Sequence, residues 1–472
     1  MQQSTLQKKN NDAFPLRILM IYILFYAGQA VYNNYIQIYE KEQLGMSLTT
    51  IGIINAIATA VIMCIKPIMG VVSDKSKNKN TIVGVMLLLC TAVGLAFYAS
   101  TGVVWTAMCL ILHNVFFNPA MSLQDGNAVE YLNENSKKWN FGHIRLGGSI
   151  GYIICSALIG TVLIALNHGV EENMDYRPIF WIMGIFFVIT AFCHFSLPPV
   201  TGKRKKNEKA HYSAVFLNRP LLCIWYLAFM NSLGQAFMRF YTIHFNEIAG
   251  TKLVGILSAT TALSEIPFFW FAGKIEQKIG TRNFLVMAGV VSVFKMSVYA
   301  LTDNVTVILL ASLITGFSFV GTQFCTVKFV NNSVPANIRS TAQTLNGLIN
   351  MVISSIIVAP IAGALADVYG IQEMMLTGVV IMFLGVAGFA IMFPKAIRYQ
   401  LKHPIEGVDM ELAFTGLLGE KKKPALVRML NESAEAQAIS NAEEAASPEE
   451  IPELMDEMEQ KDRDIESPEI KK

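Results

Sequence analysis

The sequence predicts an all-α membrane protein with twelve transmembrane helices in two six-helix bundles and with both termini in the cytoplasm. The first observation is composition: 53% of the 472 residues are hydrophobic and only 15% are charged, whereas soluble proteins carry about 25% charged residues. The second is a succession of apolar stretches of about 20 residues, the length that crosses the hydrocarbon core. The third is a basic loop at residues 198–219, which divides these stretches into two equal sets.

The apolar stretches follow one another with short polar loops between them. Residues 1–15 are polar, and the apolar run after them is too long for a signal peptide, so we expect the first helix to stay in the membrane as an anchor. Residues 395–472 end in an acidic run and are expected to form a charged cytoplasmic tail. The predicted helices cover residues 16–38, 47–73, 82–100, 103–124, 143–166 and 178–197 in the first bundle (16–197), and 220–245, 253–273, 284–302, 304–330, 341–366 and 373–394 in the second (220–394).

Lysine and arginine residues concentrate in alternate loops. The polar N-terminus, the loops at 74–80, 131–141 and 274–282, and the central loop are basic, while the loops between them carry mainly Glu and Asp. Because basic loops stay on the cytoplasmic side of a membrane, this pattern places both termini in the cytoplasm. An even number of membrane crossings agrees with that orientation.

Several classes of protein are disfavoured by what the sequence does not contain. The seven cysteines are scattered through apolar runs without metal-ligand spacing, so we expect reduced core residues. The sequence has no concentrated basic face of the kind that nucleic-acid binding needs. No Walker A string, zinc signature or nucleophile elbow is present. We therefore expect no enzyme activity, no metal and no cofactor.

A glycine–aspartate motif recurs along the chain. Gly70-Val-Val-Ser-Asp74-Lys75 follows the second predicted helix, and related strings follow the eighth (residues 273–282) and the eleventh (residues 363–370). With the strings Phe141-Gly-His-Ile-Arg-Leu-Gly-Gly-Ser-Ile-Gly and Ser264-Glu-Ile-Pro-Phe-Phe, the chain resembles the major facilitator superfamily over residues 16–394. Within it, the chain is similar to the lactose-permease-like and phenylpropionate-permease-like group of proton symporters.

That resemblance implies a multi-pass protein of the plasma membrane, which in a bacterium is the inner membrane. We expect it to be a monomer surrounded by the lipid bilayer. The resemblance implies the major facilitator fold, in which duplicated halves enclose a substrate site near mid-membrane. It also assigns Gly70, Asp74 and Lys75 to a gating motif.

Two opposite charges flank the loop between the fourth and fifth helices. Arg145 is at the start of the fifth helix, and Tyr152 lies two turns further along the same face. The guanidinium group of Arg145 and the flat ring of Tyr152 could therefore bind the same sugar. By resemblance, these positions match a substrate-binding Arg and a stacking Trp of lactose permease. Asp125 ends the fourth helix and can pair with Arg145, although an ungapped alignment puts Asn127 on the permease's substrate-binding Glu. Surface positions for Arg145 and Asp125 are the alternative.

Glu265 lies midway along the eighth helix, where an unpaired carboxyl group favours its protonated form. Lys295, midway along the ninth helix, is its expected partner and matches a functional Arg of lactose permease. Protonation of Glu265 would release Lys295, which is how we expect proton and solute to be coupled; a static ion pair is the alternative. The permease's His and Glu on the tenth helix correspond here to Thr315 and Ser318, so coupling by that pair is excluded.

Two helices of opposite halves carry polar faces. The first helix has Gln29 and Asn33, and the seventh has Asn231, Gln235 and Arg239 at intervals of four residues. Such faces suit a water-filled cavity for a polyhydroxyl solute, or else hydrogen bonds between helices. For Arg239 a partner at the outer surface, Glu247 or Glu40, is the alternative. Lys328, at the end of the tenth helix, is expected to extend to the membrane surface.

Together these features predict a secondary transporter that imports a small polar solute, a saccharide, by proton symport. The binding residues would be Arg145, Tyr152, Asp125, Asn33, Gln29, Gln235 and Asn231, with Glu265 and Lys295 coupling the proton. Alternatives are a nucleoside or aromatic-acid symporter, a drug/proton antiporter, or a transport-inactive sensor that signals through the C-terminal tail.

Overall fold

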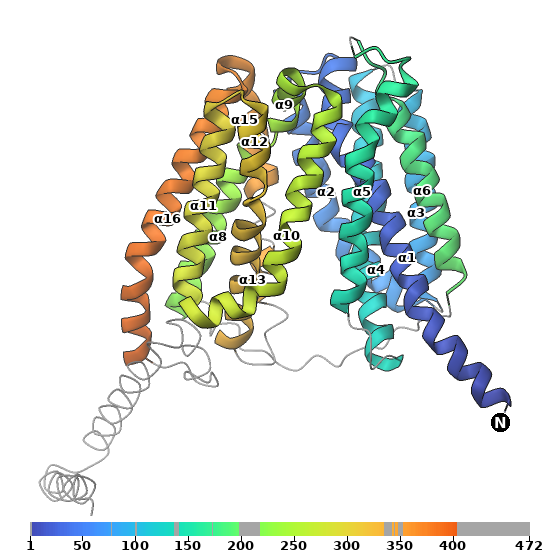
Figure 1. The fold of residues 1–472 in the computed structure, drawn as a ribbon, viewed down its shortest axis with the longest axis horizontal. Coiled ribbons are helices and arrows are strands. Elements are labelled where there is room, and N and C mark those ends of the chain that lie inside the picture. Colours follow the sequence, from blue (N-terminus) through green and yellow to red (C-terminus); the bar gives the residue numbers. More distant parts are fainter. Residues whose placement is uncertain are drawn as a thin grey trace, which may run out of the picture.

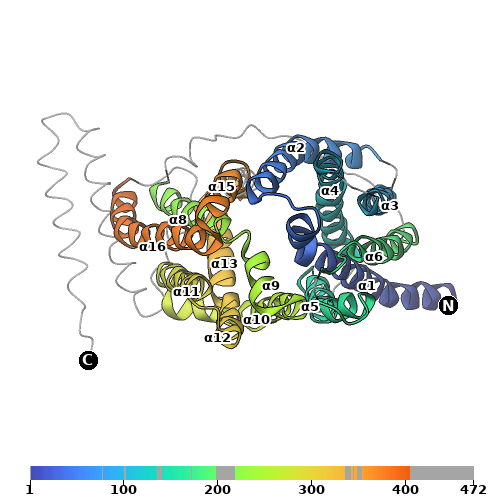
Figure 2. The ribbon, with the colours of Figure 1, turned by 90° about the horizontal axis from the view of Figure 1, so that it is seen from above.

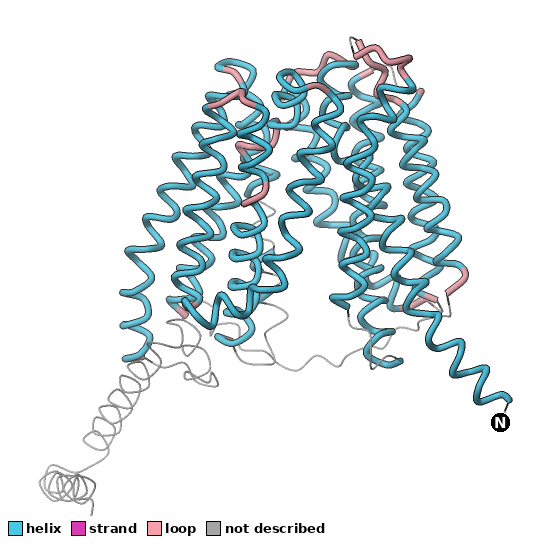
Figure 3. Tube along the Cα trace, viewed as in Figure 1, coloured by secondary structure: helices cyan, strands magenta, loops and turns pink. Residues whose placement is uncertain are grey.

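The computed structural model consists of helices arranged in two bundles that lie side by side (Figure 1). It describes residues 2–76, 78–99, 102–135, 141–171, 173–197, 218–334, 342–343, 345–347 and 353–403. Within these ranges no β-strand occurs, and short loops join the helices (Figure 3). The expected all-α architecture is therefore confirmed for the described residues.

Each bundle contains one half of the chain. The first half comprises α1 (Gln2–Ile38), the π-helical turn η1 (Tyr39–Gln43), α2 (Leu48–Asp74), α3 (Lys79–Tyr98), α4 (Val103–Asn135), α5 (Phe141–Leu166) and α6 (Pro178–Phe195). The second half comprises α8 (Arg219–Ala236), α9 (Tyr241–Ala249), α10 (Thr251–Ile279), α11 (Thr281–Leu301), α12 (Val305–Ser312), α13 (Thr315–Ser333), η3 (Ile353–Val358), α15 (Ala359–Tyr369) and α16 (Ile371–Lys402).

The number of membrane crossings agrees only in part with the twelve predicted. In the described part of the chain, 10 helices are long and apolar enough to cross a membrane, or up to 11 if α8 and α9, bent by 43°, form one span. A shorter apolar helix at Ser354–Tyr369 falls in the eleventh predicted stretch. The first and last helices exceed their predicted bounds, since α1 begins at Gln2 and α16 ends at Lys402. Residues 198–217 and 404–472 lie outside the described residues.

Local sequence signals explain where several helices begin and end. The side chains of Ser47, Asn218 and Asn304 accept hydrogen bonds from backbone N–H groups in the first turns of α2, α8 and α12, as helix caps do. Gly250 ends α9 and Gly280 ends α10, with φ of 78° and 84°. Only glycine adopts this backbone conformation without a steric penalty, so both turns can reverse the chain at once.

The two halves touch at the end of the molecule opposite the N-terminus. Here α5 packs on α10, and α2 packs on α15 (Figures 1 and 2). The Tyr35 hydroxyl of α1 donates a hydrogen bond to the Thr251 carbonyl oxygen of α10 at 2.9 Å. A methyl group on Gly255 would collide with the Ser156 carbonyl oxygen of α5, so these two helices approach as closely as their backbones allow. We call this region the closed end.

Asp367 binds the N-terminus of a helix in the other half. One carboxylate oxygen accepts from the Leu48 N–H at 2.9 Å, and the other accepts from the Thr49 N–H at 2.8 Å and the Thr49 hydroxyl at 2.6 Å. A negative charge is favoured at this position because the N-terminal N–H groups of a helix are unpaired and carry partial positive charge. The third copy of the glycine–aspartate motif thus supplies a contact between the halves at the closed end.

The first copy of that motif lies at the other end of α2. Lys75 follows the last turn of α2 and is exposed, and Gly70 faces open space. The side chain of Asp74 is outside the described part of the structure. The gating role of Gly70, Asp74 and Lys75 therefore stays a prediction.

Replacing Asp367 by Ala should weaken the closed end. Loss of a helix-capping carboxylate costs about 0.5–2 kcal/mol, so we expect a larger population in which the two halves separate at this end. The measurement is the distance distribution between spin labels at positions 104 and 368, in a variant whose native cysteines are replaced by serine.

Asp303→Asn is the control for that measurement, because Asp303 lies at the same end but bonds to Gln372 of its own half. Identical distance distributions for Asp367→Ala and Asp303→Asn would show that the Asp367 contact does not hold the halves together.

Candidate functional site

Two cavities meet in the interior of the molecule. The larger, about 1390 Å³, is lined by α1 and α5 of the first half and by α9, α10, α11 and α13 of the second. The smaller, about 600 Å³, is lined mainly by α8, α10, α11 and α13. The residues common to both walls are Thr261, Glu265, Lys295, Thr315, Phe319 and Gln323. The larger cavity extends to the start of α5 and the end of α13, away from the closed end.

Arg145 and Tyr152 both line the larger cavity from α5. The guanidinium carbon of Arg145 lies 4.2 Å from the ring centroid of Tyr26, so the cation stacks on an aromatic face. The Tyr152 hydroxyl donates to Asn34 Oδ1 at 3.2 Å, and Asn34 Nδ2 donates to Ser156 Oγ at 3.0 Å. These contacts hold a planar cation and a tyrosine ring on one wall of the cavity.

Asp125 is placed differently from the sequence expectation. Its carboxylate accepts a 2.6 Å hydrogen bond from the Tyr22 hydroxyl, and the Tyr22 ring stacks near that of Tyr26. Among the described residues, no ion pair joins Asp125 to Arg145, and Asp125 lines neither cavity. The predicted direct pair is therefore wrong for this conformation, because two tyrosine rings occupy the space between the charges.

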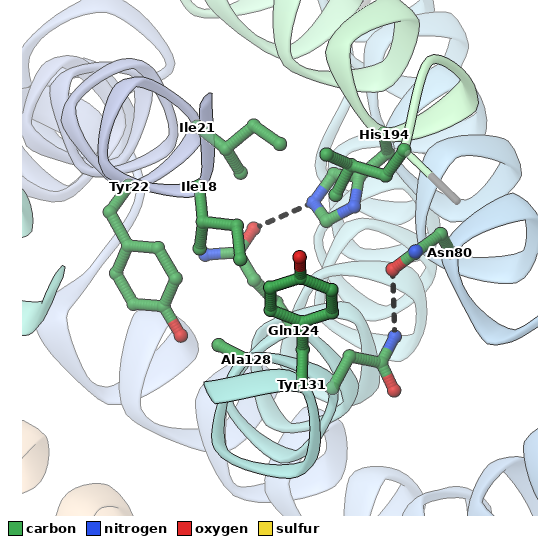
Figure 4. Close-up of a pocket in the computed structure, with 10 residues that line it drawn as sticks. Ile18, Ile21, Tyr22, Asn80, Gln124, Ala128, Tyr131 and His194 are labelled. Carbon is green, nitrogen blue, oxygen red and sulfur yellow. Dashed lines mark hydrogen bonds between the residues drawn. The ribbon is translucent and has the colours of Figure 1, made fainter. Parts of the chain in front are cut away.

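A small pocket lies within the first half, with Tyr22, Gln124, Asn80 and His194 among its lining residues (Figure 4). His194 Nε2 and Gln124 Oε1 are 3.1 Å apart, and Asn127 Nδ2 donates to Asn80 Oδ1 at 3.2 Å. Its volume of about 20 Å³ is roughly that of one water molecule. The pocket shares no lining residue with the larger cavities, so Asn127 has a packing role in this conformation.

The predicted polar faces are only partly exposed to the cavities. Gln29 lines the larger cavity, and Asn231 and Gln235 line the smaller. Gln29 Oε1 and Asn231 Oδ1 are buried, and neither has a hydrogen-bond partner in the part of the chain that the structure describes. Asn33 is exposed on the same face of α1 as Gln29 but lines neither cavity. Unpaired amide oxygens at cavity walls are available to bind a solute or water.

Glu265 and Lys295 line both cavities but do not form the expected ion pair in the described structure. Lys295 is 8% exposed, and its Nζ lies 5.6 Å from the ring centroid of Tyr299. Glu265 is half-buried, and the charge of Arg145 acts on it from the other half. The structure brings the two residues to one shared wall and leaves each without an opposite charge in contact.

The structure adds partners and lining residues that sequence reasoning did not name. Arg239 lines the smaller cavity with Asn231 and Gln235, as its spacing predicted, and donates to Ser355 Oγ at 3.2 Å; in the described structure it forms no ion pair with Glu247 or Glu40. Lys328 lines the larger cavity and bonds to Glu276 at 2.6 Å, and its extension to the membrane surface stays a prediction. The aromatic lining of the larger cavity includes Tyr26, Tyr241, Phe269, Trp270, Tyr299 and Phe319. Helical spacing could have located two of these, since Tyr26 precedes Gln29 by three residues and Tyr299 follows Lys295 by four.

Comparison with known proteins agrees with this geometry. The model of the MFS_1-like family matches residues 16–373. A probable 3-phenylpropionic acid transporter of Escherichia coli is 25% identical over 240 residues, which cover 49% of this chain and 59% of that protein. The raffinose permease of Escherichia coli is 21% identical over 382 residues, which cover 75% of this chain and 86% of the permease.

Solved structures show the same fold. The crystal structure of the nucleoside transporter NupG superposes with a TM-score of 0.69 at 15% sequence identity, covering 80% of this chain and 99% of that one. The chain is thus a multi-pass membrane protein with two helical halves around a central cavity. It belongs to the MFS_1-like family and is a major facilitator superfamily transporter.

Proposed function

We propose that this transporter imports a small polar solute by proton symport through alternating access. The observation that carries the proposal is the larger cavity, which lies between the halves, is blocked at the closed end and reaches the opposite end. The basic loops assign that opposite end to the cytoplasm. The structure then corresponds to the inward-facing state, from which a bound solute leaves into the cell.

A saccharide is the first solute class to test. The cavity walls combine amide and hydroxyl groups with aromatic rings, which can bind sugar hydroxyls and the apolar face of a sugar ring. The raffinose permease is among the relatives. Nucleosides and aromatic acids form a second candidate class, supported by the aromatic lining of the larger cavity.

Glu265 is the proposed proton carrier. Within the described structure it is the only carboxylate that lines either cavity. A carboxyl group on a wall common to both cavities can exchange a proton with water and can also respond to solute. Burial without an ionic partner disfavours the charged form of the Glu265 carboxyl group. Binding of a proton there removes that charge.

Replacing Glu265 by Gln should abolish pH-driven accumulation while leaving solute exchange intact. Gln mimics the protonated carboxyl group in size and hydrogen bonding but cannot release a proton. The measurement is uptake of labelled saccharides, nucleosides and aromatic acids into proteoliposomes with an imposed pH gradient. Glu247→Gln is the control, because Glu247 is exposed and outside both cavities.

Two results would contradict that assignment. If Glu265→Gln accumulates solute as well as the wild type, Glu265 is not the coupling acid. If the gradient drives no solute in the wild type, proton symport is wrong.

Replacing Arg145 by Lys should weaken solute binding by roughly 10-fold to 100-fold, the cost of one charge-assisted hydrogen bond. Lysine keeps the charge but loses the planar fork and its stacking on Tyr26. The measurement is the half-saturating concentration for exchange. Tyr152→Phe is the comparison, since it keeps the ring and removes only the bond to Asn34. Equal affinities for Arg145→Lys and the wild type would rule out a bidentate contact.

A further inference from the structure

Positive charges outnumber carboxylates in the walls of the two cavities. Among the described residues, Arg145, Arg239, Lys295 and Lys328 line one or both of them, whereas Glu265 is the only carboxylate that does so. Lys328 is neutralised by Glu276 at 2.6 Å. For the other three cations, the described structure shows no carboxylate within ion-pair distance.

Lys295 is the most deeply buried of these cations. It is 8% exposed, and its closest ionic or aromatic contact is the face of Tyr299, with 5.6 Å between Nζ and the ring centroid. A cation–π contact contributes roughly 0.5–2 kcal/mol, whereas removing an ammonium group from water costs several kcal/mol. The ring therefore offsets only part of the desolvation of Lys295.

Arg239 is the second cation whose partners in the described structure satisfy it only in part. Its guanidinium makes one hydrogen bond, to Ser355 Oγ at 3.2 Å, and its buried Nε has no partner among the described residues. Arg239 stands in the break between α8 and α9, which bends this span by 43°. Broken membrane helices of transporters commonly line the substrate site.

Two other lysines of the bundles, the buried Lys79 and the half-buried Lys328, have carboxylate partners. Lys79 is paired with Glu130 at 2.9 Å and Lys328 with Glu276 at 2.6 Å, each within one half of the chain. Lys295 and Arg239 face the smaller cavity instead, where a ligand can supply the missing negative charge. A neutral solute would leave both cations uncompensated as the site closes to water.

We infer that Lys295 and Arg239 form an anion-binding subsite in the smaller cavity and that the transported solute carries a carboxylate group. The inference rests on the proposed transport function and narrows its substrate class to acidic solutes, such as a sugar acid or an aromatic acid. The apolar body of the solute would lie toward Tyr299 and the aromatic lining of the larger cavity.

The same arrangement gives a physical reason for proton coupling. Glu265 shares its wall with Lys295. Among the described residues, the other charged groups that line the cavities are Arg145, Arg239 and Lys328, of which Lys328 is paired with Glu276, and His143 lines the larger cavity as well. A solute carboxylate that binds Lys295 competes with ionised Glu265 for the same positive charge. Binding of the anion thus favours protonation of Glu265, and one anion moves with one proton at no net charge.

Pairs of solutes that share a skeleton test this inference. Glucuronate is compared with glucose, and 3-phenylpropionate with 3-phenylpropanol, by calorimetric titration of the purified full-length protein without a pH gradient. Loss of the partner of a buried charge typically weakens binding by roughly 100-fold. At least one carboxylate should therefore bind about 100-fold more tightly than its neutral partner. Lys295→Gln should abolish that preference, so that the carboxylate binds no more tightly than its neutral partner.

The possible results distinguish failure of the anion subsite from failure of proton symport. The inference is wrong if no carboxylate binds more tightly than its neutral partner, or if Lys295→Gln keeps the preference. It is also wrong if chloride saturates the site and no carboxylate displaces it. A misfolded variant would lose both members of a pair rather than the preference alone. Carboxylate binding without pH-driven uptake in proteoliposomes would contradict proton symport and still support the anion subsite.

Discussion

Desolvation of charge organises the membrane part of this protein. An ammonium or carboxylate group taken out of water without a partner costs several kcal/mol, so each charge within the bundles must be paired or reach a cavity. Lys79 and Lys328 satisfy this condition with Glu130 and Glu276. Arg145, Lys295 and Glu265 satisfy it by lining cavities. These charges thus divide into pairs that hold helices together within a half and groups that line a cavity. Asp125 belongs to neither set, since it lines neither cavity and its carboxylate accepts a hydrogen bond from Tyr22.

The same constraint shapes the contact between the halves. Helical backbones satisfy their own hydrogen bonds, so two helical bundles need few polar contacts to meet. At the closed end they include the Asp367 carboxylate at the start of α2 and the Tyr35 hydroxyl at the start of α10. Asn246 adds a hydrogen bond to Glu42, and Tyr176 adds one to Thr251. Close approach at Gly255 adds backbone packing. All of these polar groups can be satisfied by water when the halves part, which makes the contact suited to repeated opening.

The position of Glu265 and Lys295 relates the two cavities to each other. Both residues stand on the wall where a cavity between the halves meets a cavity within the second half. Occupancy of either space changes the electrostatic surroundings of the same two groups. In the proposed mechanism this position, rather than a preformed ion pair, makes proton and solute binding interdependent. Arg145 adds the first half to the same site, since it lines the larger cavity from α5 together with Glu265.

The sequence by itself determined the fold class, the family and most helix positions, because hydrocarbon imposes length and apolarity on each span. It located Arg145, Tyr152, Glu265 and Lys295 for the same reason, since charged and polar side chains stand out in apolar stretches. It also predicted that the seven cysteines are core residues, and this holds for Cys90, Cys109, Cys223 and Cys325, which are buried, whereas Cys64 is exposed.

Only the tertiary structure decided which of those side chains meet. Tyr22 donates a hydrogen bond to Asp125, and Glu276 pairs with Lys328. Arg239, at the break between α8 and α9, lines the smaller cavity and donates to Ser355. The helical period placed Arg239 on one face with Asn231 and Gln235, but it could not supply these partners, because each of them is many residues away in the sequence. Pair formation depends on how helices rotate and pack against one another, and that is a property of the assembled bundles.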